Sequence, residues 1–146
     1  MKTPPVCFGA RDNTFGSFVV PSSGKLVSVK LVHVYGYVTC DKRNRAYWSF
    51  WGCCHYPKDV NVVITNSFDK ILLPSNEFFT GLVLKRSSIP GYNSLSPELV
   101  LSAVSNPLNV AGGQELRLWY GQDLANGLEG NNGGTSCCDF YVRTTR

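Results

Sequence analysis

Charged residues are scarce in this chain, and several familiar sequence features are missing. Only 16% of its 146 residues are Asp, Glu, Lys or Arg, whereas 43% are hydrophobic, a balance that excludes an intrinsically disordered protein. No apolar run approaches the ~20 residues that a transmembrane helix needs. The net charge of +4 is mild and spread along the chain, so it does not indicate a nucleic-acid-binding protein. At this length, we predict one domain with a single core, residues 1–146.

Motifs for catalysis are also absent. The chain lacks a nucleophile elbow, a zinc-protease helix motif and a phosphate-binding loop, and its two histidines, His33 and His55, follow no catalytic pattern. Asp123 and Glu129 are the carboxylate pair best placed in the sequence for glycoside hydrolysis, which requires a set distance between two carboxyl groups. The sequence therefore favours a protein that is not an enzyme, and a glycoside hydrolase ranks third among the functions considered.

A secretory leader is missing as well, although the cysteine content points outside the cell. The first seven residues, Met-Lys-Thr-Pro-Pro-Val-Cys, include a basic residue but no apolar segment of the kind found in signal peptides. Six cysteines beside a single methionine are typical of an oxidising compartment. We therefore predict a secreted, extracellular protein in which Met1 stands where a leader has been removed.

The cysteines predict a disulfide-braced fold. They are two single residues and two adjacent pairs: Cys7, Cys40, Cys53–Cys54 and Cys137–Cys138. Neighbouring side chains on an extended backbone point to opposite sides, so the members of each pair should bond to different partners. We predict that all six form disulfides, that Cys7 tethers the N-terminal segment, and that one of the C-terminal pair bonds to one of the central pair. A structural zinc site is disfavoured because neither pair has the spacing that lets two thiolates face one ion.

Short strands separated by turn residues dominate the rest of the chain. Alternating or β-branched patterns predict strands at 25–38, 59–65, 69–73, 78–86 and 115–120, and another strand that opens at the C-terminal cysteine pair. Ser96-Pro97-Glu98 could open a helix, but the contiguous apolar residues 99–101 favour a strand there. Seven to nine short strands with at most one brief helix predict an all-β fold, a β-sandwich of jelly-roll or Greek-key type. A small closed barrel is the alternative.

The longest predicted strand carries two finer predictions. Alternation places Leu31, His33, Tyr35 and Tyr37 on one face of the strand 25–38. Gly36 in its middle predicts a bulge or a close approach of another backbone.

An aromatic segment is the first candidate for ligand binding. Residues 47–56 contain five aromatic rings and a histidine, and they follow a basic loop at 42–45. Flat rings stack on the apolar faces of sugars and on cations, and guanidinium groups suit sulfate or phosphate. The predicted ligand-binding residues are Arg43, Arg45, Tyr47, Trp51, His55 and Tyr56. The alternative is that Trp48, Phe50 or Trp51 fill the core beside a disulfide.

The loop before the last strand is the candidate metal site. It is rich in glycine and in the hard oxygen donors that calcium prefers, and its candidate ligands are Asp123, Asn126, Glu129, Asn131 and Asp139. The spacing matches neither an EF-hand loop nor a repeat of the glycine-rich calcium type. Calcium is therefore a candidate cofactor, and the alternative is a solvated turn whose Asn and Asp side chains cap their own backbone.

These features lead to a ranked prediction of function. The layout resembles small extracellular jelly-roll binding domains in architecture, without a motif diagnostic of any one of them. We predict a secreted, lectin-like recognition module that binds carbohydrate, with an extracellular glycan or matrix component as its partner. A structural or defence protein of secretions or matrix that binds no small ligand is the second hypothesis.

Overall fold

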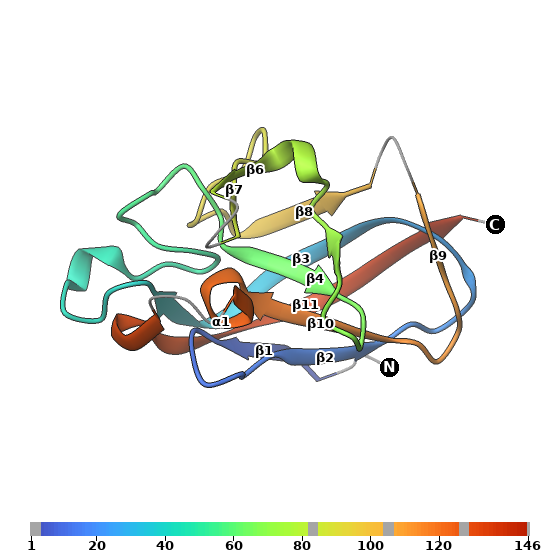
Figure 1. Ribbon diagram of the computed structural model, residues 1–146, viewed down its shortest axis with the longest axis horizontal. Helices are drawn as coiled ribbons and strands as arrows, with labels where there is room; N and C mark the ends of the chain where they lie inside the picture. The colour runs from blue at the N-terminus through green and yellow to red at the C-terminus, as the bar shows by residue number, and fades with distance from the viewer. Residues whose placement is uncertain (1–3, 82–84, 104–106, 126–128, 146) are drawn as a thin grey trace.

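A computed structural model describes residues 4–81, 85–103, 107–125 and 129–145, and their longer strands form two antiparallel sheets (Figure 1). In chain order the described elements are β1 (Val6–Gly9), β2 (Gly16–Val19), β3 (Gly24–Thr39), η1 (Arg45–Tyr47), β4 (Val62–Thr65), β5 (Ile71–Leu73), η2 (Asn76–Phe78), β6 (Phe79–Gly81), β7 (Arg86–Ser87), β8 (Glu98–Ser102), β9 (Leu108–Val110), β10 (Glu115–Tyr120), α1 (Gly121–Ala125), η3 (Glu129–Asn131) and β11 (Gly133–Thr145).

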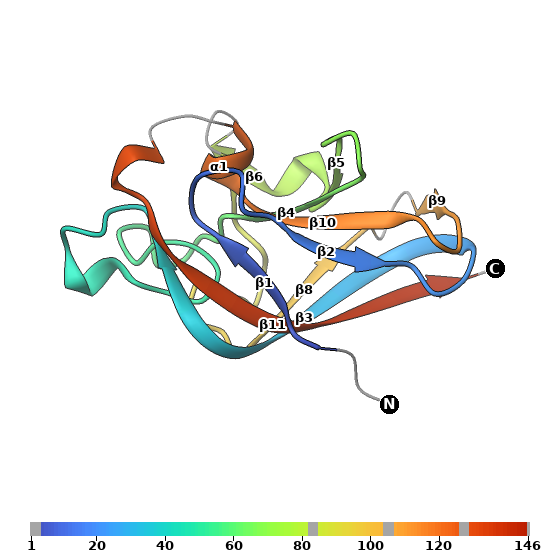
Figure 2. The same ribbon diagram turned by 90° about the horizontal axis from the view of Figure 1, so that it is seen from below.

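The two sheets pack face to face as a sandwich. One sheet has the order β1-β11-β3-β8, with β9 also paired to β3, and the other has the order β2-β10-β4-β5. Figure 2 shows the two layers edge-on, with η1 at one end of the molecule and the C-terminus at the other. The predicted disulfide-braced β-sandwich is therefore confirmed, while its type, jelly roll or another Greek key, stays a prediction.

The core is built from the inward faces of both sheets. Leu31, Leu99 and Leu101 come from the first sheet and Leu116 and Leu118 from the second, and all five are fully buried. Burying one such side chain stabilises the fold by about 1.5 to 3 kcal/mol, so the alternation seen in the sequence is what holds the two layers together. The strand register follows from this burial, because a slip of one residue would turn these side chains into solvent.

The pairing of β3 with β11 corrects the prediction that Leu31, His33, Tyr35 and Tyr37 all share one face of the strand. The register shifts between Cys137 and Cys138, opposite the part of β3 that precedes Gly36. Gly36 itself has φ +88°, and a side chain there would collide with the Thr135 carbonyl, so the predicted irregularity is confirmed. Because the shift changes which side the residues face, Leu31 is fully buried whereas Tyr35 and Tyr37 are 58% and 52% exposed.

Several predicted boundaries also change. The segment 98–102 is a strand, β8, as predicted, and 115–120 is β10. The predicted strand 78–86 is instead a hairpin of two short strands, β6 and β7, with residues 82–84 outside the described part. The helix α1 was not predicted, because its five residues are too few to show a helical period.

Two disulfides are present, not three, and their pairing corrects the prediction. Cys7 bonds to Cys137, which joins β1 to its neighbour β11 and confirms that Cys7 tethers the N-terminal segment. Cys40 bonds to Cys53, so the predicted bond between the central and C-terminal pairs is wrong. The reason is that Cys137 lies directly opposite Cys7 in the pairing of β1 with β11, while Cys138 belongs to the hydrophobic core.

The remaining two cysteines are free thiols, contrary to the prediction that all six would pair. Cys138 is fully buried, and burial raises its pKa to about 12, with the neighbouring Asp139 charge adding to the effect. Cys54 is half-buried, with its Sγ 3.4 Å from the Trp48 carbonyl. The vicinal pairs therefore each supply one disulfide and one thiol.

Candidate functional site

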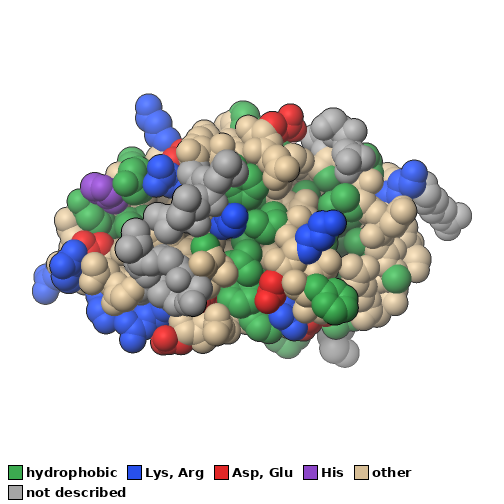
Figure 3. Space-filling model, in the orientation of Figure 1, with side chains coloured by type: hydrophobic (Ala, Val, Ile, Leu, Met, Phe, Trp, Pro, Cys, Tyr) green, Lys and Arg blue, Asp and Glu red, His purple; other side chains and the backbone are tan. Residues whose placement is uncertain are grey.

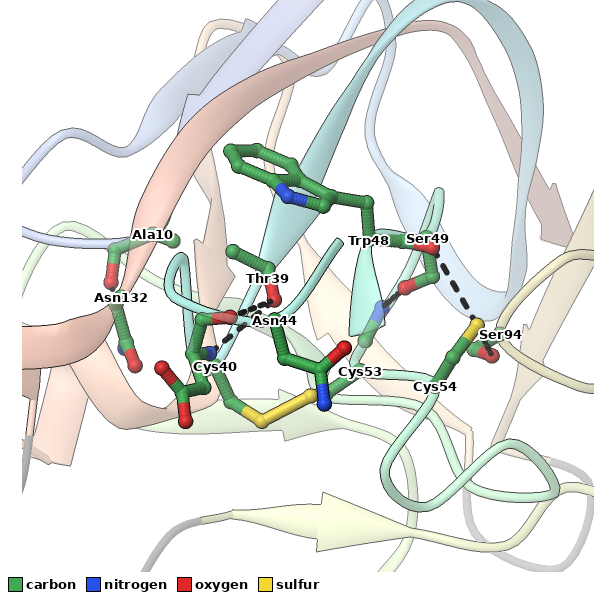
Figure 4. The surroundings of a disulfide bond; sticks show 12 residues. Ala10, Thr39, Cys40, Asn44, Trp48, Ser49, Cys53, Cys54, Ser94 and Asn132 are labelled. Carbon is green, nitrogen blue, oxygen red and sulfur yellow. Dashed lines mark hydrogen bonds between the residues drawn. A yellow bond between two sulfur atoms is a disulfide. The ribbon is translucent and has the colours of Figure 1, made fainter. Parts of the chain in front are cut away.

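A disulfide-closed loop forms the end of the molecule at which η1 lies. It leaves β3 at Cys40 and returns at Cys53, and the bond between these residues fixes its base (Figure 4). Inside the loop, Ser49 and Val38 exchange backbone hydrogen bonds of 2.8 Å in both directions, which adds a short strand-like contact to β3. The Asn44 side chain caps η1 by accepting a hydrogen bond from the Ala46 amide. The loop is thus held at its base, its middle and its helical turn.

Three aromatic rings form a continuous row that begins in this loop and continues just beyond Cys53. The ring centroids of Tyr47 and His55 are 4.8 Å apart, and those of His55 and Tyr56 are 4.6 Å apart. The Arg86 guanidinium lies 3.8 Å over the Tyr56 ring and forms an ion pair of 2.9 Å with Asp59. A shallow hollow of about 380 Å³ opens beside the row, lined by His55, Tyr56, Pro57, Lys58 and Asp59. We call this region the aromatic–basic surface, comprising Arg43, Arg45, Tyr47, His55, Tyr56, Lys58, Asp59 and Arg86.

Two acids, Asp41 beside this surface and Asp59 within it, form ion pairs with arginines. The Arg43 side chain donates from Nε and Nη2 to both oxygens of Asp41, at 2.9 and 3.1 Å. This hydrogen bonding lowers the pKa of Asp41 and raises the pKa of Arg43, and the charge of nearby His55 lowers the Asp41 pKa further. Asp59 forms an ion pair with Arg86, with 2.9 Å between Arg86 Nε and Asp59 Oδ2. Both pairs are close to neutral, so they offer oriented donors and acceptors rather than net charge.

Trp51 corrects the predicted set of ligand-binding residues. Its side chain is fully buried, its ring lies parallel to that of Phe8 with 6.5 Å between centroids, and its Nε1 donates to the Ser96 carbonyl at 2.7 Å. The prediction that Trp51 contacts a ligand is therefore wrong, and the alternative of a core tryptophan holds. The backbone bends at residues 50–52, so Trp51 does not continue the extended segment around Ser49.

The other predicted binding residues lie at the surface. Tyr47 is half-buried, while Arg43, Arg45, His55 and Tyr56 are exposed. Trp48 is half-buried (Figure 4). Its ring packs so closely on Gly134 of β11 that any side chain at this position would overlap it. Sequence reasoning missed Lys58, Asp59 and Arg86, since no pattern in the sequence links β7 to the segment around residue 56.

The candidate calcium ligands are not gathered in one place. Asp123 is fully buried in α1, and its two oxygens accept hydrogen bonds from the amides of Asn13 and Thr14 at 2.8 and 2.9 Å. Asp139 lies in β11 of the other sheet, at a groove of about 640 Å³ that also involves Tyr141. Across the described residues, no group of three or more His, Cys, Asp or Glu side chains could hold a metal. Asp123 thus holds the loop between β1 and β2 in place. Because its side chain is fully buried, a substrate could not reach the carboxylate considered for glycoside hydrolysis.

Of the remaining candidates, Asn131 contacts the loop that carries η1. Asn126 falls outside the described residues, and Glu129 begins η3. The Asn131 carbonyl accepts from the Lys42 amide at 2.8 Å, which joins this loop to the one that carries η1. Next to it, Asn132 is fully buried and donates to the Ala10 carbonyl, while its Oδ1 accepts no hydrogen bond from the described residues.

Comparison with known proteins decides the family. No protein-family model and no curated protein sequence matches the chain. Among solved structures, the chain is similar to AJLec, a lectin from the sea anemone Anthopleura japonica, with 36% identity and a TM-score of 0.86. The match covers 99% of this chain and 95% of that one.

The chain belongs to the AJLec family of lectins. Membership in the AJLec family confirms the prediction of a lectin-like, carbohydrate-binding module with a disulfide-braced β-sandwich. No helix in the described ranges is long and apolar enough to cross a membrane.

Proposed function

We propose that this chain is a secreted lectin whose carbohydrate ligand binds on the aromatic–basic surface. The observation that carries the proposal is the row Tyr47–His55–Tyr56 beside a hollow, in a member of the AJLec family. The row begins in the disulfide-closed loop and continues just beyond Cys53. Aromatic rings pack against the apolar faces of sugars, and a few fixed polar groups then set orientation.

The polar groups beside the row suit sugar hydroxyls. Asp59 is locked against Arg86, and Asp41 against Arg43, so their remaining lone pairs and N–H groups point in fixed directions. A hydroxyl both donates and accepts, so it can bind to a carboxylate and a guanidinium at the same time. Pre-ordered partners of this kind lose little entropy when a ligand binds.

We also propose calcium as a cofactor at the neighbouring residues Asn131 and Asn132. Support comes from the buried Asn132 Oδ1, which lacks a described partner, and from the preference of calcium for amide, carbonyl and carboxylate oxygens. When bound there, calcium would brace a segment that already contacts the η1 loop, through the hydrogen bond from the Lys42 amide to the Asn131 carbonyl. Thermal unfolding with calcium and with a chelator tests the idea, and an unchanged midpoint would exclude it.

Glycan-array binding followed by calorimetry tests the sugar site. Tyr56→Ala removes a ring that is 42% exposed in the row, and Tyr141→Ala removes one that is 50% exposed on β11, away from the row. We expect Tyr56→Ala to weaken binding of the best array ligand about tenfold, or ~1.4 kcal/mol, and Tyr141→Ala to leave it unchanged. The opposite order would refute the placement of the site, and an array without any bound glycan would refute the function.

A further inference from the structure

We infer, building on the lectin function proposed above, that the aromatic–basic surface selects acidic glycans, in which sulfate or carboxylate groups accompany the sugar ring. The row of rings by itself would accept a neutral sugar. The cations around the row add a preference for negative charge.

Three of these cations are not neutralised by the protein. Among the described residues, Lys42, Arg45 and Lys58 form no ion pair, and all three are exposed. The nearby acids Asp41 and Asp59 are already paired with arginines. Figure 3 shows Lys and Arg side chains gathered at the end of the molecule where η1 lies. This end therefore carries a surplus of positive charge that the protein leaves to be balanced from outside.

The cations stand on both sides of the ring row. Arg45 opens η1, two residues before Tyr47, and Lys58 lines the hollow beyond Tyr56. The Lys42 stem lies over Gly133, and its ammonium group extends from the same loop. An oligosaccharide stacked on the row would thus bring its substituents within reach of positive charge at either end.

Electrostatic reasoning gives the size of the effect. Exposed ion pairs contribute little singly, so the three cations together should strengthen binding of a sulfated sugar about tenfold over its neutral counterpart at low salt. Binding of the sulfated sugar should weaken with salt, with a slope of log affinity on log salt between about −1 and −3, whereas neutral sugars should show a slope of roughly zero. Aromatic stacking would be common to both ligands.

Calorimetry with matched oligosaccharides of equal length tests the selectivity. The probes are a heparin-derived hexasaccharide, a hyaluronan hexasaccharide that carries carboxylates alone, and neutral chitohexaose. We expect the first to bind about tenfold tighter than the third. The position of the hyaluronan probe tells whether sulfate is needed or carboxylate suffices.

A pair of matched charge variants locates the effect. Arg45→Gln with Lys58→Gln should reduce heparin-hexasaccharide affinity about fivefold, a clearly larger factor than its effect on chitohexaose affinity. Lys25→Gln with Lys70→Gln, which removes two exposed lysines elsewhere, should change neither. Equal loss in both variants would mean that the preference reflects overall charge, and would overturn the inference.

The remaining outcomes separate the inference from the proposed function. If neutral and sulfated probes bind equally and Tyr56→Ala weakens both, the lectin site stands and acid selectivity is refuted. If no saccharide binds, the proposed function fails. If phosphatidylserine vesicles bind and compete away the heparin probe while sugars alone bind weakly, the cations serve a lipid surface and the inference is overturned.

Discussion

The two disulfides should have separable roles in stability and ligand binding. Removing the bond that closes the η1 loop, by Cys40→Ala with Cys53→Ala, frees a loop with a sequence separation of 13. In the chain-entropy treatment this costs about 3 kcal/mol of unfolding free energy. Removing the Cys7–Cys137 bond, with a separation of 130, should cost about 5 kcal/mol by the same treatment.

Ligand binding should show the reverse order. The Cys40–Cys53 bond holds the loop that carries Tyr47, whereas the Cys7–Cys137 bond joins the neighbouring strands β1 and β11. Loss of the first bond should therefore loosen the ring row and weaken glycan binding about tenfold, since a mobile loop must be ordered on binding. Loss of the second should leave glycan affinity unchanged under conditions where the protein is folded.

Urea unfolding and calorimetry measure the two effects, and thiol titration checks the pairing. The wild-type protein should show two thiols in denaturant, Cys54 and Cys138, and one in the native state, because Cys138 is buried and its pKa is raised to about 12. Cys54→Ser serves as a control that removes a thiol without opening a disulfide. Full glycan affinity in the Cys40/Cys53 variant, or a larger loss of stability there than in the Cys7/Cys137 variant, would refute the reasoning.

Three further substitutions test the structure by urea unfolding. Trp51→Phe should lower the free energy of unfolding by about 2 kcal/mol, because it leaves a cavity and removes the hydrogen bond to the Ser96 carbonyl. Unchanged stability would contradict the placement of Trp51 in the core. Gly134→Ala should cost about 3 kcal/mol, since φ is +90° and a side chain there would overlap the ring of Trp48, and an unchanged midpoint would contradict that contact. Asp123→Asn should lower the free energy of unfolding by about 2 to 3 kcal/mol, because the amide has one acceptor oxygen whereas the two oxygens of Asp123 each accept from a backbone N–H. Stability equal to that of the wild type would contradict this role of the carboxylate.

The strands were predictable where burial and alternation coincide. Residues 115–118 alternate polar and apolar side chains, and they lie in β10 with Leu116 and Leu118 fully buried. The segment 98–102 was correctly assigned to a strand because its apolar residues are contiguous rather than spaced as on a helix. The region 78–86 was misjudged, since a hairpin of such short strands leaves too few residues to show a period.

The candidate site was predictable in part. Tyr47, His55 and Tyr56 were identified from their density in the sequence, and the structure places their rings in contact. Trp51 was included wrongly, because composition does not tell which of several neighbouring rings turns inward. Arg86 was missed because it reaches Tyr56 from a different strand, a contact that the chain order does not reveal.

The sequence by itself determined the class of fold and the kind of surface. Alternating β-branched residues, turn residues and cysteines dictate a braced sandwich, since these are local preferences that each segment carries with it. Only the tertiary structure decided which cysteines bond, which tryptophan is core and which carboxylates are already used. Those outcomes depend on the register of β3 against β11 and on the path of the η1 loop, and both are set by packing between residues far apart in the chain.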